Sequence, residues 1–325
     1  MLVTLVIGGA AAWAWRDLTS PVTPGGGMAL ISTAPGEPLG AVATRLVGAR
    51  VIRHAWTLRL WARWYGLDRQ MQPGEYRFDR PRAPIEVVAA LCSSVDALHR
   101  VTIPEGVSAA RTAELLAAAG FGGADVFRCV AADPNLLLEL DLPATGIEGY
   151  LFPDTYAFAW GTAPKEIVRS MVTRFRDEAA ALDARRRAAG LSEHAMVTLA
   201  SLIESETGAA HERPLIAAVF HNRLRIGMPL QSDPTAVYGR PGHVIPTAAD
   251  LAADSPYNTY LHRGLPPGPI CNPGRAALEA AVAPAATEHL YFVSRNDGTH
   301  VFSASLEEHN RAVARFQREQ GRSRP

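Results

Sequence analysis

Between residues 195 and 203 the chain carries a predominantly apolar run that leads into two acidic residues, Glu204 and Glu206. The run starts near His194, and neither glycine nor proline interrupts it before Gly208. An apolar run of this length closed by a glycine predicts a helix. Successive helical residues are turned by about 100°, so the two glutamates point to nearly opposite sides.

The two sides of this predicted helix differ in polarity. Large aliphatic residues share the side of Glu206: Leu199, Leu202 and Ile203. Smaller or more polar residues share the side of Glu204: Val197, Ala200 and Ser201. Apolar surroundings raise the pKa of a carboxyl group, so Glu206 is the better candidate for an acid that donates a proton to a leaving oxygen. A solvated glutamate, or an ion pair with Arg213 or Arg223, is the alternative.

The first hundred residues mix short strand and helix patterns, which predicts a small α+β unit. Expected strands cover residues 28–31 and 74–78, and expected helices cover residues 39–47, 57–65 and 84–91. Aromatic residues at helical spacing more often build a core than a sugar-binding platform. This expectation applies to four residues: Trp56, Trp61, Trp64 and Tyr65.

A second unit begins near residue 101, where a strand and a turn lead into an alanine-rich helix over residues 108–119. Ser108 is a favourable N-cap for that helix. Residues 164–187 predict one long basic amphipathic helix whose charges face solvent. Near the C-terminus, apolar runs on both sides of Asn296-Asp297-Gly298 predict a hairpin within residues 290–302.

The N-terminus opens on an apolar run of 14 residues from Leu2 to Trp15. A transmembrane helix needs about 20 apolar residues, and the basic residues that normally begin a signal peptide are absent. Residues 19–27 contain two prolines and three consecutive glycines, which predicts a flexible linker.

Composition narrows the class of protein. The 325 residues suggest about two domains, and 48% hydrophobic with 20% charged residues is ordinary for folded domains. The 32 basic and 32 acidic residues cancel and form no basic stripe, so nucleic acid is not expected as a partner. Neither the ten histidines nor the three cysteines, Cys92, Cys129 and Cys271, have metal-ligand spacing. No metal, disulfide framework or cofactor is therefore expected.

Several segments in a fixed order resemble a known family. They are residues 147–156 (IEGYLFPDTY), 199–207 (LASLIESET), 221–235 (HNRLRIGMPLQSDPT), 255–260 (SPYNTY), 264–270 (GLPPGPI) and 290–293 (LYFV) with His309 and Asn310. From about residue 28 to the C-terminus, the chain resembles the endolytic murein transglycosylase family (MltG, or YceG-like).

The resemblance implies an α+β fold with a small LysM-like module followed by a mixed α/β catalytic domain in which a helix carries the catalytic glutamate. The implied domains are a short or truncated N-terminal membrane anchor at 1–18, a linker at 19–27, the LysM-like module at 28–98 and the YceG-like catalytic domain at 99–325. The module suggests contact with glycan. A spacer that positions the catalytic domain is the alternative role.

The resemblance also implies a reaction. The family's acid is the second glutamate of a Glu-x-Glu-Thr segment, which is Glu206 here, and Glu204 is the second choice or a supporting carboxylate. The reaction is that of a lytic transglycosylase, a carbon–oxygen lyase. It cleaves the β-1,4 bond between N-acetylmuramic acid and N-acetylglucosamine within peptidoglycan strands and leaves a 1,6-anhydro-muramic end.

Polar and aromatic residues on the later segments are expected to hold the sugar. These substrate-binding candidates are Gln231, Asp233, Tyr257, Asn258, Thr259 and Tyr260. The same segments are also turn signals in which Asp233 and Asn258 would bond local backbone. Glu148 would join the site if its loop folds back toward Glu206, whereas capping a nearby backbone amide is the alternative.

Family members carry one N-terminal membrane helix, so the resemblance implies a single-pass protein of the cell inner membrane with an extracytoplasmic, periplasmic catalytic domain. A late start codon or a trimmed helix would account for the short apolar run. Expected partners are peptidoglycan glycan strands and a peptidoglycan synthase complex, with termination of nascent strands as the role.

Two other functions stay open at this stage. One is a noncatalytic glycan-binding protein of the envelope, which needs no protonated carboxyl group. The other is a water-using hydrolase, which needs a second carboxylate about 5 to 9.5 Å from the acid. Glu148 or Asp233 would have to supply it.

Overall fold

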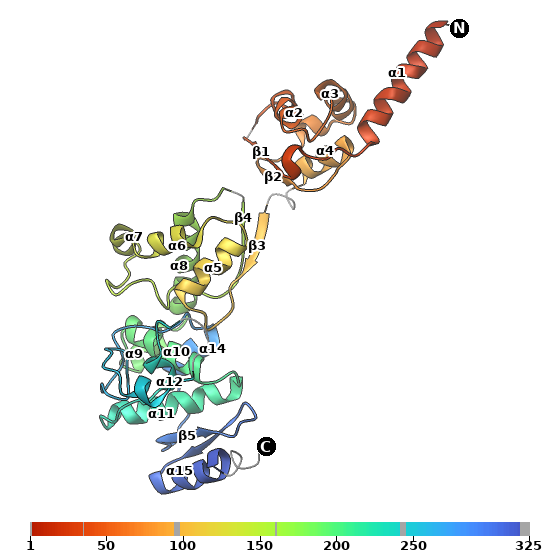
Figure 1. Ribbon diagram of the computed structural model, residues 1–325. Coiled ribbons are helices and arrows are strands. Elements are labelled where there is room, and N and C mark those ends of the chain that lie inside the picture. The colour runs from red at the N-terminus through yellow and green to blue at the C-terminus, as the bar shows by residue number, and fades with distance from the viewer. Residues whose placement is uncertain (1, 35, 94–97, 160, 241–244, 319–325) are drawn as a thin grey trace. The chain divides into compact units, whose positions relative to one another are not determined.

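The computed structural model describes residues 2–34, 36–93, 98–159, 161–240 and 245–318. Within these ranges the chain is a mixed α+β protein, about half helical, with three two-stranded sheets (Figure 1). The α+β expectation is therefore confirmed in this general form. The chain divides into unit 1, residues 1–100 with 157–162, and unit 2, residues 101–156 with 163–325. The expected domain types and their boundary at 98/99 stay predictions, because compactness alone does not identify a domain family.

Unit 1 is a pair of antiparallel strands covered by helices. Its elements are α1 (Leu2–Thr19), η1 (Gly25–Gly27), β1 (Ala29–Thr33), α2 (Leu39–Gly48), α3 (Ala55–Trp64), η2 (Leu67–Arg69), β2 (Gly74–Phe78) and α4 (Pro84–Cys92). In β1, alternate residues are buried, and Ile31 lies opposite Tyr76 of β2. Leu46, Leu58 and Leu91 from the three covering helices complete the core.

The segment that predicts a flexible linker is hydrogen-bonded to the rest of unit 1. Val22 and Arg82 exchange backbone hydrogen bonds, and the Gly25 amide donates to the Ala49 carbonyl at 3.0 Å. None of the described helices, α1 included, combines the length and apolarity needed to cross a membrane.

The aromatic residues of α3 do not build the core as expected. Trp56, Trp64 and Tyr65 are 52%, 83% and 60% exposed. Trp61 alone is half-buried, and its ring lies 5.1 Å from that of Tyr65. The core expectation was wrong for the three exposed residues because Leu58 and Ala62 occupy the buried face of α3.

Strand β3 (Leu98–Thr102) pairs with β4 (Thr155–Ala159), and the division between the units falls within both strands. The other elements of unit 2 are α5 (Ala109–Ala118), α6 (Ala124–Ala131), α7 (Pro134–Glu139), α8 (Pro164–Ala180), α9 (Asp183–Ala188), α10 (Glu193–Glu206), η4 (Ala210–Glu212), α11 (Arg213–Arg225), α12 (Asp233–Ala236), α13 (Ala248–Leu251), α14 (Arg275–Val282), β5 (Tyr291–Ser294), β6 (His300–Ser303), α15 (Leu306–Val313) and η5 (Ala314–Arg318).

Two local expectations for unit 2 are confirmed and one is wrong. Ser108 caps α5 by accepting the Arg111 amide, and β5 and β6 form the expected antiparallel hairpin. The single helix expected over residues 164–187 is instead two helices, α8 and α9. The side chain of Leu182, in the turn between them, is buried. A continuous helix with a solvated face would not need to bury this residue.

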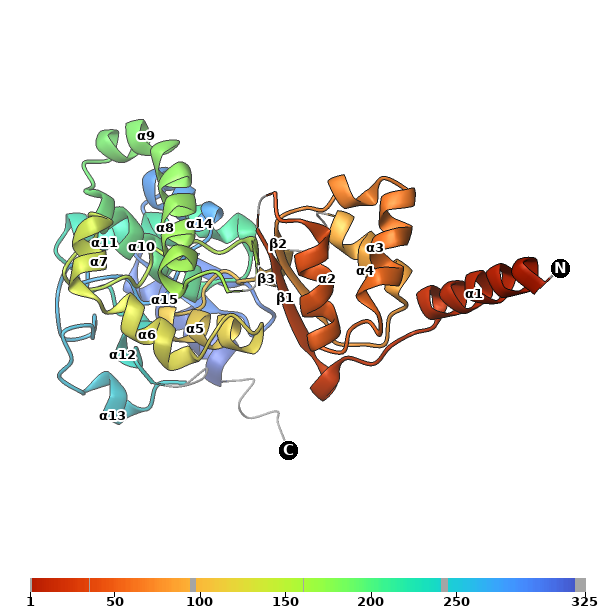
Figure 2. The same cartoon turned by 90° about the horizontal axis from the view of Figure 1, so that it is seen from above.

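Helix α10 is the buried centre of unit 2. Every residue from Met196 to Ile203 is buried, and α10 packs against α11, α12 and α14. A helix that is apolar on all sides is a core helix. Figure 2 shows α10 beside α11 and α14.

Asn272 ties the loops around α10 together. Its Oδ1 accepts hydrogen bonds from the Gly149 and Leu151 amides, both at 3.0 Å, and its Nδ2 donates to the Val107 carbonyl at 2.9 Å. The side chain is fully buried. Gly149 adopts φ +88°, and a Cβ there would lie 2.5 Å from Pro269.

Replacing Gly149 by alanine should therefore destabilise unit 2. Overpacking costs about 1–3 kcal/mol, and a left-handed alanine costs about 1 kcal/mol more. Gly190, at φ +70°, has no neighbouring atom within 4 Å of the place where a Cβ would lie, so Gly190→Ala should cost only the backbone strain. Chemical denaturation of the full chain compares the two variants, and equal losses would contradict the packing argument.

Candidate active site

Glu206 is the last residue of α10, and Thr207 after it is already extended. Three of its helical neighbours, Leu199, Leu202 and Ile203, are completely buried. The C-terminal end of a helix carries partial negative charge, which further disfavours an ionised carboxyl group there. The helix therefore places a carboxyl group where its charged form is poorly stabilised.

The Glu206 carboxyl group accepts a hydrogen bond from the hydroxyl of Ser232, which donates to Oε1 at 2.5 Å. The pKa of Glu206 is raised to about 7, mainly by burial and also by the nearby Asp233, although the Ser232 hydrogen bond and the charge of Arg223 lower it. At neutral pH a large share of the chains therefore hold a proton on Glu206. This is the protonation state that a general acid needs.

A network of threonine hydroxyls fixes the position of Ser232. The Ser232 amide donates to Thr259 Oγ1 at 3.0 Å, and Thr235 Oγ1 donates to the Ser232 carbonyl at 2.6 Å. The hydroxyl oxygens of Thr235 and Thr259 lie 2.8 Å apart, and all three side chains are buried. Ser232 therefore cannot move away from Glu206 without breaking these bonds.

Arg223 of α11 holds the loop before Ser232. Its guanidinium donates to the Leu230 carbonyl at 2.7 Å, to Gln231 Oε1 at 3.2 Å and to the Leu290 carbonyl at 2.7 Å. It lies 5.4 Å from the centre of the Tyr291 ring. Its Nε and Nη1 donors go to neutral oxygens, and among the described residues Arg223 forms no ion pair, so it lies near Glu206 as a buried cation.

Glu204 lies in a different environment. Its Oε1 accepts from Arg213 at 2.9 Å, and its Oε2 accepts from the Gly274 amide at 3.2 Å. Both side chains are more than nine-tenths buried. Both oxygens of the Glu204 carboxyl group therefore already have partners, and this geometry favours the ion-pair role over that of an acid.

Glu105 is a carboxyl group near this pair that no sequence motif singled out. Its Oε2 lies 4.0 Å from Arg213 Nη2. Burial and the adjacent Glu204 raise its pKa, and Arg213 lowers it. Its position directly after Pro104, in a turn before a helix, is the only sequence signal it offers.

Glu148 caps a helix. Its Oε1 accepts from the Ala109 amide at 2.8 Å, at the first turn of α5, and its Oε2 accepts from Tyr238 at 3.3 Å. Burial raises the pKa of Glu148 to about 7 although these hydrogen bonds lower it. The capping role that the sequence left open is therefore the one its contacts favour.

The expected substrate-binding residues fall into two groups. Asn258 and Thr259 are buried, and the Asn258 side-chain amide donates to the carbonyls of the 250–253 segment. Their contacts favour the alternative structural role. The others have exposed or half-buried side chains that a ligand can reach: Gln231, Asp233, Tyr257 and Tyr260.

Two of these accessible residues are linked to each other and lie near the carboxyl group of Glu206. The Tyr260 hydroxyl donates a hydrogen bond to Asp233 Oδ1 at 2.6 Å. The charge of Asp233 raises the pKa of Glu206, and the charge of Glu206 raises the pKa of Tyr260. Tyr257 instead packs against Tyr238, with ring centroids 4.6 Å apart. Tyr238 belongs to no expected site and was missed because it lies outside the motif segments.

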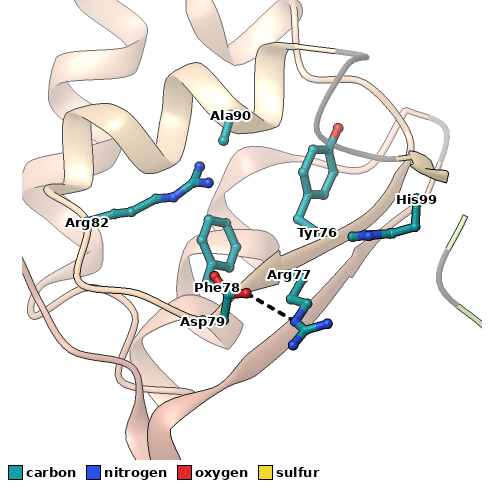
Figure 3. A pocket seen from close by; sticks show the side chains of 7 residues that line it. All are labelled: Tyr76, Arg77, Phe78, Asp79, Arg82, Ala90 and His99. Atoms are coloured by element: carbon teal, nitrogen blue, oxygen red, sulfur yellow. Dashed lines mark ion pairs between the residues drawn. The ribbon is translucent and has the colours of Figure 1, made fainter. Parts of the chain in front are cut away.

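Unit 1 holds a separate cavity of about 140 Å³ (Figure 3). Its lining residues are Tyr76, Arg77, Phe78, Asp79, Arg82, Ala90 and His99. The lining contains one carboxylate, Asp79, which Figure 3 shows paired with Arg77. Asp79 Oδ2 lies 3.4 Å from Arg77 Nε. This cavity therefore offers no proton donor comparable with Glu206. Among the described residues, no group of histidine, cysteine or acidic side chains could hold a metal ion.

Comparison with known proteins identifies relatives across both units. The YceG-like family matches residues 31–315. A Bacillus subtilis (strain 168) protein named endolytic murein transglycosylase is 31% identical over 330 residues, covering 96% of this chain and 91% of that protein. A protein of the same name from Streptococcus pneumoniae serotype 2 (strain D39) is 34% identical over 200 residues, covering 58% of this chain and 36% of that protein.

A solved structure is also similar to this chain over most of its length. The crystal structure of a yceG-like protein from Listeria monocytogenes matches with a TM-score of 0.62 at 29% identity, covering 88% of this chain and 99% of that chain. The family match includes both glutamates of α10 and every expected substrate-binding residue.

The two glutamates should respond oppositely to substitution. The pKa of Glu206 is about 7 in the folded chain and ordinarily 4.5, so the unfolded chain releases the proton first and stability falls as pH rises between these values. Glu206→Gln removes this effect. We expect it to raise the free energy of unfolding by roughly 1–3 kcal/mol at pH 8, with a smaller gain at pH 5, measured by urea denaturation.

Glu204→Gln is the matched comparison. It leaves the Arg213 guanidinium buried without its closest anion and should lower the free energy of unfolding by about 3 kcal/mol. If Glu206→Gln instead lowered stability most at pH 8, Glu206 would be held as an ion and the proposed burial effect would be wrong.

Proposed function

This chain belongs to the YceG-like family and is an endolytic murein transglycosylase, and we propose that Glu206 is the acid that breaks the glycosidic bond. The observation that carries the proposal is the carboxyl group itself. It lies half-buried at the C-terminal end of α10, where it accepts a hydrogen bond from Ser232 and has a pKa of about 7. Its position in the Glu-x-Glu-Thr segment supports the same assignment.

In the first step, protonated Glu206 gives its proton to the oxygen that links N-acetylmuramic acid to N-acetylglucosamine. The bond between that oxygen and the muramic anomeric carbon breaks, and positive charge develops on the sugar as in an oxocarbenium ion. The N-acetylglucosamine side leaves as an alcohol. The enzyme now carries the Glu206 carboxylate.

In the second step, this carboxylate takes the proton from the C6 hydroxyl of the same muramic residue. The C6 oxygen then bonds to the anomeric carbon and closes a 1,6-anhydro ring, so no water is consumed. The step is intramolecular and gains from proximity when the sugar is held with C6 facing the reacting carbon. Ser232 and Arg223 stabilise the transient carboxylate by a hydrogen bond and by charge.

The accessible polar residues near Glu206 would bind the sugar. Asp233 and Tyr260 are joined by their hydrogen bond, and Gln231 is exposed on the loop that Arg223 holds. Amide and hydroxyl groups of the two sugars offer matching donors and acceptors. Tyr257, with Tyr238, provides a partly exposed aromatic surface of the kind on which sugar rings pack.

A water-using hydrolase is the alternative chemistry, and Asp233 is the carboxylate that would activate the water. Asp233 is instead an acceptor for the Tyr260 hydroxyl. Glu148, the other candidate, caps α5. These contacts support the transglycosylase mechanism.

As an enzyme of the cell wall, the protein acts outside the cytoplasm. We infer further that α1 anchors it in the inner membrane, because most residues from Leu2 to Trp15 are apolar. The proposal has three further parts. Unit 1 contacts glycan in a LysM-like role, the enzyme terminates nascent strands, and it works beside a peptidoglycan synthase complex. Recovery of no peptidoglycan synthase after cross-linking in membranes would count against the complex.

Digestion of purified peptidoglycan tests the acid. Glu206→Gln should lower the rate by about 10²- to 10⁴-fold, the usual contribution of a general acid, and mass spectrometry of the wild-type products should show anhydro-muramic ends. Glu204→Gln is the control at a neighbouring carboxylate. Loss confined to Glu204→Gln would transfer the role, and products heavier by one water would establish a hydrolase.

The pH dependence tests the role of Ser232. Because the acid must start protonated, kcat/KM should fall as pH rises above about 7. Ser232→Ala removes a hydrogen bond that stabilises the carboxylate, so the midpoint of this fall should move to higher pH. Ser205→Ala, whose hydroxyl bonds the Ser201 carbonyl, should leave the midpoint in place. A downward shift in Ser232→Ala would contradict the assignment.

A further inference from the structure

Helix α3 exposes a stripe of large apolar side chains on the surface of unit 1. Trp56, Leu60 and Trp64 are 52%, 61% and 83% exposed, and their spacing of four residues puts them on one face of the helix. Arg59 and Arg63 are exposed between them. These five residues are called the α3 stripe below.

The charge of α3 is of one sign. Its ten residues include two arginines and no acidic residue. Within the described part of the chain, neither Arg59 nor Arg63 forms an ion pair. An amphipathic helix with tryptophan on its apolar side and arginine beside it is suited to the interface of an anionic bilayer.

Contacts inside unit 1 join α3 to the apolar helix α1. Asp17 of α1 is buried and accepts hydrogen bonds from Thr57 Oγ1 at 2.7 Å and from His54 at 3.1 Å. Trp13 of α1 stacks on Trp56, with ring centroids 5.7 Å apart and planes 11° apart. The stripe therefore begins where the apolar run of α1 ends.

The orientation of α3 fits a membrane surface. In both Figure 1 and Figure 2, α3 runs across the direction of α1 rather than along it. If α1 enters the bilayer along its normal, α3 lies along the bilayer surface, and Trp13, Trp56 and Trp64 can lie together at headgroup depth. Indole rings are enriched at that depth.

We propose that the α3 stripe docks unit 1 on the anionic lipid surface of the membrane. This goes beyond the anchoring inferred for α1, because a second surface of the folded unit contacts lipid and so limits the orientation of unit 1 at the membrane. The occupant is a bilayer because the stripe joins exposed tryptophans and arginines without ion-pair partners to an apolar helix.

The test measures contact between the stripe and lipid directly. The full chain is reconstituted in vesicles of phosphatidylethanolamine and phosphatidylglycerol whose acyl chains carry bromine near the headgroup, which quenches nearby indole emission. The wild type is compared with a chain carrying Trp56→Phe and Trp64→Phe. Leu138→Ser, at an 81% exposed apolar residue of unit 2, is the control for loss of any exposed apolar side chain.

Docking predicts that the double variant loses much of the lipid-quenched emission while Leu138→Ser retains it. Replacing both Arg59 and Arg63 by serine should reduce quenching in vesicles that contain phosphatidylglycerol and leave it unchanged in zwitterionic vesicles. Circular dichroism checks that each variant is folded.

The proposal would be overturned if the brominated lipid quenched none of the indole emission of the wild type. It would also be overturned if the quenched fraction of the emission were equal or larger in the tryptophan double variant. A glycan strand or a second copy of the chain on the stripe would give that result. Anchoring by α1 is tested separately by flotation of the chain with the vesicles. A chain that floats but shows no quenching at α3 is anchored through α1 and does not dock through the α3 stripe. The peptidoglycan digestion is independent of both.

Discussion

The site depends on one constraint: a helix buried along most of its length ends in a carboxyl group. Residues Met196 to Ile203 of α10 are all buried, so the helix cannot turn without exposing the core of unit 2, and Glu206 is held half-buried at its end. Burial and the negative end of the helix disfavour ionisation, and the Ser232 hydroxyl opposes them. The balance sets a pKa of about 7. A carboxyl group at that value can both give and take a proton at neutral pH, as the two-step mechanism requires.

Helix α11 supplies the cations that separate the roles of the two glutamates. Arg213, at its start, contacts Glu204 directly at 2.9 Å. Arg223, near its end, donates to backbone carbonyls and Gln231 and acts on Glu206 only through its charge. The same helix therefore engages one glutamate in a direct ion pair, whereas it offers the other only a more distant charge that moderates its pKa.

The helical period of the sequence predicted α10 and the opposite directions of its two glutamates, because both follow from local geometry. Ser108 as an N-cap and the hairpin around Asn296-Asp297-Gly298 were predictable for the same reason. Ser232 was missed as the partner of Glu206 because the two are 26 residues apart and meet only through tertiary packing. Asn272 was missed likewise, since its partners lie more than a hundred residues away. The exposed face of α3 was misjudged because periodicity identifies a face but not which face is buried.

The central claim is that folding makes Glu206 a neutral-pH acid. Carbon-13 NMR of the side-chain carboxyl groups, with Glu206 assigned by comparison with Glu206→Gln, measures this directly across a pH titration of the folded chain. The account predicts a pKa of about 7 for Glu206. A value near 4.5, the ordinary value for glutamate, would mean that the carboxyl group is ionised at neutral pH and would contradict its role as the acid.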